Sequence, residues 1–176
     1  MEATDVLMKR AAAFIARRAH SRGELRRKLS AAAEEGAQKD DAKIYSAAEI
    51  ETVLDRLERL NLLNDAEYAY NFAFSRIHDS GWGEEKVREA LICRYIEKAV
   101  ADQVIDRARE ELQPDGIEDA LMEYVEGYCR KHGEPSTLKD AQKLARHLAG
   151  RGFAQDAIID ALQEIIPPEI FRHFET

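Results

Sequence analysis

Apolar residues recur along most of the chain with the spacing of amphipathic helices. The clearest stripe lies in SAAEIETVLDRLERL, residues 46–60, at positions i, i+3, i+4, i+7 and i+10: Ile50, Val53, Leu54, Leu57 and Leu60. Three pairs have the spacing of a helix cap and an acidic side chain: Ser46 and Glu49, Asn64 and Glu67, and Thr137 and Asp140. No segment shows the alternation of a strand, so the pattern predicts an all-α protein.

Three short segments of the chain align with one another: ELRRKL at 24–29, KVREAL at 86–91 and KLARHL at 143–148. Each contains two apolar residues four positions apart, which places both on one face of a helix. These pairs are Leu25 and Leu29, Val87 and Leu91, and Leu144 and Leu148. Each segment follows a helix that ends near a histidine and precedes another amphipathic helix, so the repeated unit is predicted to be three helices.

The predicted repeats divide the chain into three successive parts and a tail. Their bounds are 4–60, 64–112 and 115–166, with the C-terminal tail at 167–176. The first repeat has extra polar residues near 35–46, which predict an inserted loop. One such unit has little apolar surface of its own, so neighbouring repeats are expected to stack. Pro114 separates two helices, and Pro167 and Pro168 are expected to end the last helix of the third repeat.

Composition agrees with a helical, non-membrane protein. Charged residues make up 34% of the chain, and Gly (9) and Pro (4) are too sparse for a turn-rich β architecture. The sequence has no apolar run of roughly 20 residues, which a membrane span requires, and its first residues lack a signal-peptide pattern. Cys93 and Cys129 are too far apart to form a familiar metal motif or disulfide framework. We therefore expect a reduced, cytoplasmic protein, with both thiols buried or half-buried.

The charge is distributed unevenly. The whole chain carries a formal net charge of −8, yet residues 1–30 hold eight Lys or Arg against three Asp or Glu. Residues 101–176 hold nine basic and 16 acidic residues. This asymmetry permits a local contact with a polyanion. The simpler interpretation is that each helix has a solvated charged face.

The histidines invite a metal hypothesis, which their positions do not favour. His20, His78 and His132 are each expected near the end of the first helix of a repeat, where a cation interacts favourably with the helix dipole. His147 falls within a helix and His173 in the tail, and no H-x-x-x-H or C-x-x-C pair occurs. We expect no metal site and no cofactor.

Catalytic motifs are also missing from the sequence. It contains no nucleophile elbow, phosphate-binding loop or dinucleotide fingerprint. The glycine pair in GWG, residues 81–83, is interpreted as a turn that lets Trp82 pack against a neighbouring helix, because Glu84 and Glu85 follow and would repel an anion. The protein is therefore not expected to be an enzyme.

The basic helix in HSRGELRRKL, residues 20–29, is the strongest functional feature of the sequence. If Leu25 and Leu29 face inward, Arg27 lies opposite them, with Arg26 and Lys28 on either side. Such a cluster can contact phosphates or an acidic protein surface, and the sequence leaves both open. The candidate partner-binding residues are Arg17, Arg18, Arg22, Arg26, Arg27 and Lys28, together with Arg76 and Arg88 of the second repeat.

Three ordered segments resemble the RecX family of recombination regulators. They are ARRAHSRGELRRKL at 16–29, VLDRLERLNLLNDAEYAYNF at 53–72 and SRIHDSGWGEEKVREAL at 75–91, within a match over residues 11–112. LARHLAGRGFAQDAIIDAL, at 144–162, is similar to the family's weaker C-terminal part. The resemblance implies tandem three-helix repeats in an elongated, curved array.

The resemblance also implies a partner, the RecA recombinase filament on DNA. Members of the family lodge in the groove of that filament and inhibit its ATPase, strand-exchange and coprotease activities, and some bind DNA. This chain departs from the family pattern at Glu84 and Glu85, in the long loop near 35–46 and in its acidic net charge. We expect a monomeric regulator of recombination and the SOS response, with at most weak DNA contact. The alternatives are a DNA-binding module without a recombinase partner and a helical adaptor for another protein.

Overall fold

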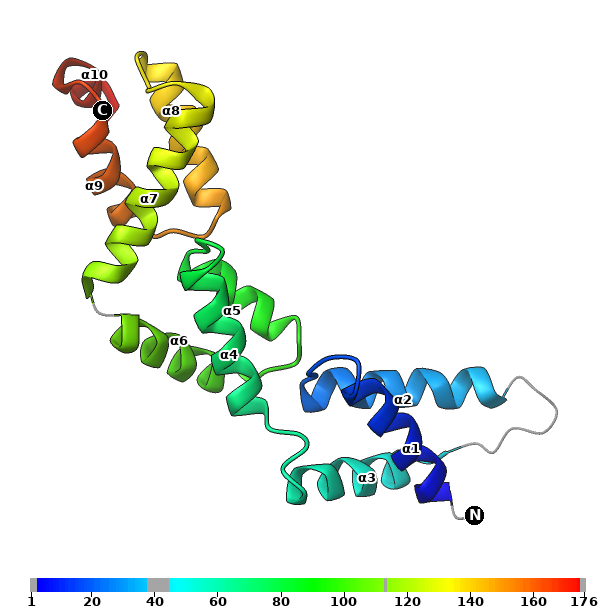
Figure 1. Ribbon diagram of the computed structural model, residues 1–176. Coiled ribbons are helices and arrows are strands. Elements are labelled where there is room, and N and C mark those ends of the chain that lie inside the picture. The colour runs from blue at the N-terminus through cyan, green and yellow to red at the C-terminus, as the bar shows by residue number, and fades with distance from the viewer. Residues whose placement is uncertain (1–2, 38–44, 113, 175–176) are drawn as a thin grey trace. The chain divides into compact units, whose positions relative to one another are not determined.

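A computed structural model describes residues 3–37, 45–112 and 114–174, and these residues form ten α-helices and no strand (Figure 1). The helices are α1 (Ala3–Ile15), α2 (Arg22–Ala37), α3 (Ala47–Arg59), α4 (Asp65–His78), α5 (Glu84–Ile92), α6 (Lys98–Leu112), α7 (Pro114–His132), α8 (Leu138–Gly150), α9 (Gln155–Ile165) and α10 (Pro168–Phe174). The all-α prediction is confirmed. The predicted loop near 35–46 lies mostly outside the described residues, because α2 continues to Ala37 and the description resumes at residue 45.

The predicted helix starts are confirmed by their hydrogen bonds. At α3 the backbone N of Glu49 donates to Ser46 Oγ at 3.2 Å, and the backbone N of Ser46 donates to Glu49 Oε2 at 2.8 Å. At α4 the backbone N of Glu67 donates to Asn64 Oδ1 at 3.1 Å. The Thr137 side chain caps α8 in the same way. Each cap satisfies a backbone N–H that has no partner within its own helix.

The chain divides into two compact units. Unit 1 comprises Met1–Ala69 and Leu91–Val100, and unit 2 comprises Tyr70–Ala90 and Ala101–Thr176. In unit 1, α1, α2 and α3 pack against one another around a common core. The residues of this core are Leu7, Ala11, Leu25, Leu29, Ile50, Val53, Leu54, Leu57 and Leu63.

Leu60 is an exception to the predicted stripe of α3. Its side chain is 56% exposed, because α3 ends at Arg59 and the chain turns there. The next residue, Asn61, has a φ of 54°. The stripe therefore ends at Leu57, one helical turn earlier than the sequence pattern predicts.

In unit 2, α7, α8, α9 and α10 enclose a second core. Its buried residues are Leu121, Val125, Ala141, Leu144, Leu148, Ile158, Ala161, Leu162, Ile166 and Phe171. The burial of Leu144 and Leu148 matches that of Leu25 and Leu29 in unit 1, as the aligned segments predict. Helix α10 lies in the segment assigned to the tail, where Phe171 packs on the core formed with α8 and α9.

Two hydrogen bonds to carbonyl oxygens of turns occur at aligned positions. In unit 1, Ser21 Oγ donates to the carbonyl oxygen of Arg94 in the turn after α5. In unit 2, the backbone N of Gly83 donates to the carbonyl oxygen of Arg151 in the turn after α8, at 2.9 Å. In the alignment of ELRRKL, KVREAL and KLARHL, position 21 corresponds to 83, and position 94 corresponds to 151. The residue before α2 thus contacts the turn after α5 in unit 1, and the residue before α5 contacts the turn after α8 in unit 2.

Candidate functional site

The exposed acidic face of α3 binds two arginines of the basic helix α2. The Arg22 guanidinium, whose side chain is 20% exposed, lies 2.7 Å from Glu51 Oε2 and 2.6 Å from Asp55 Oδ1 and also contacts Glu58. Arg26 donates from Nη2 to Glu51 Oε2 at 3.0 Å. The three carboxylates follow one another at i, i+4 and i+7, so they share one face of α3. The charge of Arg22 and Arg26 is therefore largely neutralised within unit 1.

Two more of the predicted arginines are also neutralised within the protein. Arg18 makes a two-pronged ion pair with Glu24, with both N···O distances 3.2 Å. Arg88 donates from Nε to Asp102 Oδ1 at 2.7 Å and also contacts Glu85. Arg18 pairs with a carboxylate of α2, and Arg88 pairs with carboxylates of α5 and α6. A count of charges along the sequence does not reveal these pairs.

The four remaining predicted residues keep more of their charge available. Arg17 is exposed and makes no ion pair with any described residue. Arg27 donates to Tyr95 Oη at 3.3 Å, and Lys28 Nζ lies 5.0 Å from the Phe14 ring centroid. The free positive charge of the predicted surface in unit 1 is therefore reduced to Arg17, Arg27 and Lys28. Their binding to a partner stays a prediction.

The fourth, Arg76, belongs to unit 2 and stacks on aromatic rings. Its guanidinium carbon lies 5.2 Å from the Phe72 ring centroid and 5.1 Å from that of Trp82. The Trp82 ring meets the Phe72 ring edge-on, with centroids 6.4 Å apart. The prediction that the GWG turn packs Trp82 against a helix is confirmed, because Phe72 and Arg76 both belong to α4. Glu84 pairs with Arg109 at 2.7 Å, so its charge is also neutralised.

The helix-dipole interpretation is wrong for His20. Helix α1 ends at Ile15, and the His20 ring is buried, 4% exposed, beyond that end. Its Nδ1 donates to the Arg18 carbonyl oxygen at 2.8 Å, and burial lowers the pKa of the ring, which disfavours the charged imidazole. His78 and His132 are the last residues of α4 and α7, as predicted.

The structure places both cysteines and tests the described residues for a metal-binding group. The expectation that both thiols are buried or half-buried is wrong for Cys93, which is exposed, and is confirmed for Cys129, which is half-buried. Among the described residues, no group of three or more His, Cys, Asp or Glu side chains is placed to hold a metal ion. None of the described helices is long and apolar enough to cross a membrane.

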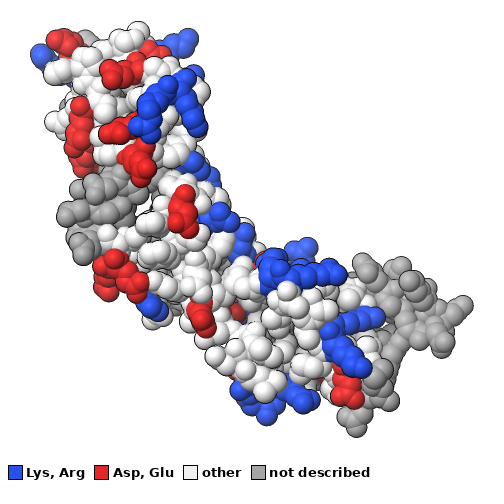
Figure 2. Space-filling model, viewed as in Figure 1, with Lys and Arg blue, Asp and Glu red and all other residues white. Residues whose placement is uncertain are grey.

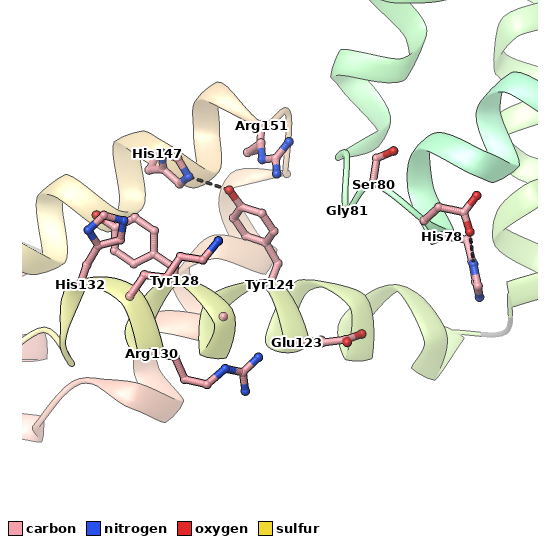
Figure 3. Close-up of a pocket in the computed structure, with 13 residues that line it drawn as sticks. His78, Ser80, Gly81, Glu123, Tyr124, Tyr128, Arg130, His132, His147 and Arg151 are labelled. Carbon is pink, nitrogen blue, oxygen red and sulfur yellow. Dashed lines mark hydrogen bonds and ion pairs between the residues drawn. The ribbon is translucent and has the colours of Figure 1, made fainter.

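A pocket of about 560 Å³ lies in unit 2 between α7, the end of α8 and the turn after α4 (Figure 3). The His147 and Tyr124 rings stack 5.9 Å apart, and Tyr124 Oη shares a 2.7 Å hydrogen bond with His147 Nε2. The Arg151 guanidinium carbon lies 4.3 Å from the Tyr124 ring centroid. The sequence analysis missed this site, because Tyr124 comes from α7, whereas His147 and Arg151 come from α8 and the turn after it, with no motif that joins them. The only available signal was the histidine within KLARHL.

Comparison with known proteins identifies the family. No family model matches the chain. The protein named regulatory protein RecX from Salmonella arizonae is 32% identical over 172 residues, which cover 96% of this chain and 91% of that protein. Those from Pseudomonas tolaasii and Prosthecochloris aestuarii are 33% identical over 145 residues and 31% identical over 163 residues. The chain belongs to the RecX family.

Solved structures of RecX proteins agree with this fold. The crystal structure of RecX from Lactobacillus salivarius matches with a TM-score of 0.74 at 18% identity, covering 92% of this chain and 96% of that one. A second crystal structure of regulatory protein RecX matches with a TM-score of 0.70 at 15% identity, covering 92% and 71%. At these identities the similarity establishes the shared RecX fold.

The ion-pair cluster of α2 and α3 in this RecX-family chain predicts a loss of stability in acid. Hydrogen bonds from Arg26 and then Arg22 lower the pKa of Glu51 to about 2. The unfolded chain binds the proton more readily, so the contribution of Glu51 is complete above about pH 4.5 and is lost as the pH falls toward 2. Because the side chain is 39% exposed, solvent screening limits this contribution to about 1 kcal/mol.

Replacing Glu51 with Gln is expected to flatten the pH dependence of unfolding between pH 4.5 and pH 2, measured by urea denaturation. The matched control is Glu97→Gln, an exposed glutamate of unit 1 that makes no ion pair with a described residue. Equal slopes for the two variants would show that the Glu51 cluster does not stabilise the folded state.

Proposed function

We propose that this chain is a regulator that binds filaments of the RecA recombinase on DNA, in their groove. Binding slows ATP hydrolysis, strand exchange and the coprotease activity of RecA, and so restrains recombination and the SOS response. The observation that carries the proposal is the match to proteins named regulatory protein RecX, at 31–33% identity over as much as 96% of the chain. The sequence motifs that support the same family cover both units.

Exposed apolar side chains in unit 1 support a protein partner. Leu60 and Leu62 are 56% and 55% exposed and lie two residues apart in the turn after α3. Ile92 and Tyr95 are also exposed, at the end of α5 and in the turn that follows. Large apolar side chains of this kind form the centre of protein interfaces, whereas contacts to naked DNA are mostly charged. Arg27 donates to Tyr95 and adds a positive charge beside one of these residues.

The RecA ATPase is the direct test of this proposal. We expect the protein to slow ATP turnover by RecA of the same organism on single-stranded DNA, with the effect rising and then saturating as protein is added. Turnover is measured at constant RecA and DNA. An unchanged rate at saturating protein would contradict the proposal, whatever the protein does with DNA alone.

The same assay tests the remaining positive surface of α2. The double variant Arg27→Ala, Lys28→Ala is expected to need about tenfold more protein for half-inhibition, because each charge at an interface rim contributes on the order of 0.5–1 kcal/mol. The control is Lys139→Ala, Lys143→Ala, which removes two exposed charges from α8 instead. If the two double variants inhibit equally well, α2 does not face the partner.

A further inference from the structure

Several cations of unit 2 have no carboxylate partner among the residues that the structure describes. Among the described residues, Arg151, Lys131 and Arg146 make no ion pair. Lys86 Nζ donates to the Gly150 carbonyl oxygen at 3.3 Å and lies 4.8 Å from the Trp82 ring centroid, and both of these groups are neutral. Figure 2 shows Lys and Arg side chains gathered over α8 in this view. The acidic C-terminal half of the chain therefore carries a local positive surface, in contrast to the neutralised arginines of α2.

The pocket beside this surface holds its basic groups in fixed positions. Arg151 stacks on Tyr124, and His147 is held by Tyr124 Oη and by the Tyr128 ring, whose centroid is 5.0 Å away. The His132 ring lies 4.4 Å from the Tyr128 ring. Figure 3 shows these side chains following one another along one wall of the pocket, with Ser80 and Gly81 across from Tyr124. Rings that fix a guanidinium and two imidazoles lower the entropy lost when a ligand binds them.

We propose that this pocket of unit 2 binds a phosphate group. A phosphate offers three strong acceptor oxygens and up to two negative charges, and a guanidinium together with imidazoles and lysines supplies matching donors. Tyr128 also lines the pocket, and a tyrosine hydroxyl group is a neutral donor. A carboxylate has two oxygens and one charge, so it would use fewer of these groups. The proposal does not depend on RecA, because it concerns the isolated protein and a small anion.

The charges around His147 support an anion site. The acidic groups that line the pocket are Asp79, which pairs with His78 at 2.9 Å, and Glu123, which projects from the side of α7 away from α8 (Figure 3). The basic groups are Arg151, His132 and Lys131, with Lys86 nearby and with Arg130, which lies 3.6 Å from Glu126. Burial lowers the pKa of His147, and the positive charges of Arg151, His132 and Lys86 lower it further. An anion in the pocket would offset both effects and favour the charged imidazole.

The test is a titration of the full chain with phosphate ligands at constant ionic strength. NMR signals of the histidine side chains are recorded at each ligand concentration and pH. We expect inorganic phosphate to raise the pKa of His147 by about one unit, because a phosphate dianion beside an imidazole favours its protonation. His147→Gln assigns the signal. His20, which is buried in unit 1, serves as an internal reference whose pKa should not move.

Further ligands distinguish the source of the phosphate. Adenosine monophosphate tests a free nucleotide, and a short single-stranded oligonucleotide tests nucleic acid. Comparing that oligonucleotide with and without a 5′-phosphate separates a chain end from the backbone. Comparing the affinities of these ligands for the pocket shows which kind of phosphate binds most tightly.

Variants show whether the basic groups of the pocket hold the ligand. Arg151→Gln and, separately, Lys131→Gln are expected to weaken phosphate binding about tenfold and about threefold, because charge-assisted hydrogen bonds are lost. Arg107→Gln is the matched control, since Arg107 pairs with Glu111 at 3.1 Å and does not line the pocket. No phosphate-dependent change at His147, or equal weakening by the control, would overturn the proposal. Failure of the RecA assay would leave it standing.

Discussion

Replacing Gly83 with Ala is expected to destabilise unit 2 by about 3 kcal/mol, at the upper end of the cost of overpacking. A Cβ atom at position 83 would lie 2.0 Å from the carbonyl oxygen of Gly152 and 2.3 Å from the backbone N of Phe153. These neighbours are backbone atoms, so a change of rotamer cannot relieve the clash. The start of α5 would have to move away from the turn after α8, and the hydrogen bond from Gly83 to Arg151 would be lost. Thermal unfolding followed by circular dichroism measures the effect.

Gly150→Ala is the matched control for this prediction. Gly150 is the last residue of α8, and a Cβ atom there would meet nothing within 4 Å. Alanine favours a helix over glycine, so this variant is expected to keep or slightly raise the melting temperature. If Gly83→Ala melts at the same temperature as Gly150→Ala, the close approach of the two backbones does not stabilise unit 2.

A close approach between a helix start and the following turn also occurs in unit 1. A Cβ atom at Gly23 would lie 2.1 Å from Tyr95 Cβ, and Tyr95 has a φ of 62°, in the left-handed region that favours glycine. At the aligned position of unit 2, Gly152 has a φ of 84°. The two turns therefore share a left-handed backbone conformation at the aligned position, with a tyrosine in unit 1 and a glycine in unit 2. Tyr95 accepts a strained conformation, and its hydroxyl group accepts a hydrogen bond from Arg27.

Much of the fold could be predicted from the sequence, because its signals are local. Helix stripes, caps and breakers act over a few residues, and the structure places Ser46, Asn64 and Thr137 at the helix starts that were predicted. The errors lie at chain turns. Leu60 continues the apolar spacing of α3, but the helix ends before it, and the energetics of that turn depend on packing rather than on periodicity.

The candidate site was harder to predict, because it depends on which side chains meet across helices. The sequence HSRGELRRKL predicts a basic helix whose positive charges are available to a partner. In the structure, three carboxylates of α3 surround Arg22, and one of them also binds Arg26. Conversely, residues 101–176 carry a net negative charge, yet Lys131, Arg146 and Arg151 make no ion pair with a described residue. Net charge along a segment therefore predicts a binding surface poorly when the opposite charges occupy different faces.

Leu57→Ala is expected to destabilise unit 1 by about 2–5 kcal/mol, the usual cost of removing a leucine from a closed core. Leu57 is completely buried among the helices α1, α2 and α3. Its loss removes apolar burial and leaves a cavity that the three packed helices cannot fully close. Urea denaturation at neutral pH gives the change in the free energy of unfolding, and inhibition of RecA is expected to fall in proportion to the fraction unfolded.

Leu60→Ala makes the same chemical change one helical turn away, where the side chain is 56% exposed. Its effect on stability is expected to stay within about 0.5 kcal/mol, because an exposed side chain loses little burial. If Leu60 contacts the RecA filament, inhibition of the ATPase should weaken although the protein remains folded. The pair thus separates a residue that makes the fold from one that meets a partner. If folded Leu60→Ala inhibits the RecA ATPase normally, this turn does not belong to the proposed interface. If Leu57→Ala leaves the free energy of unfolding unchanged, the core described for unit 1 is wrong.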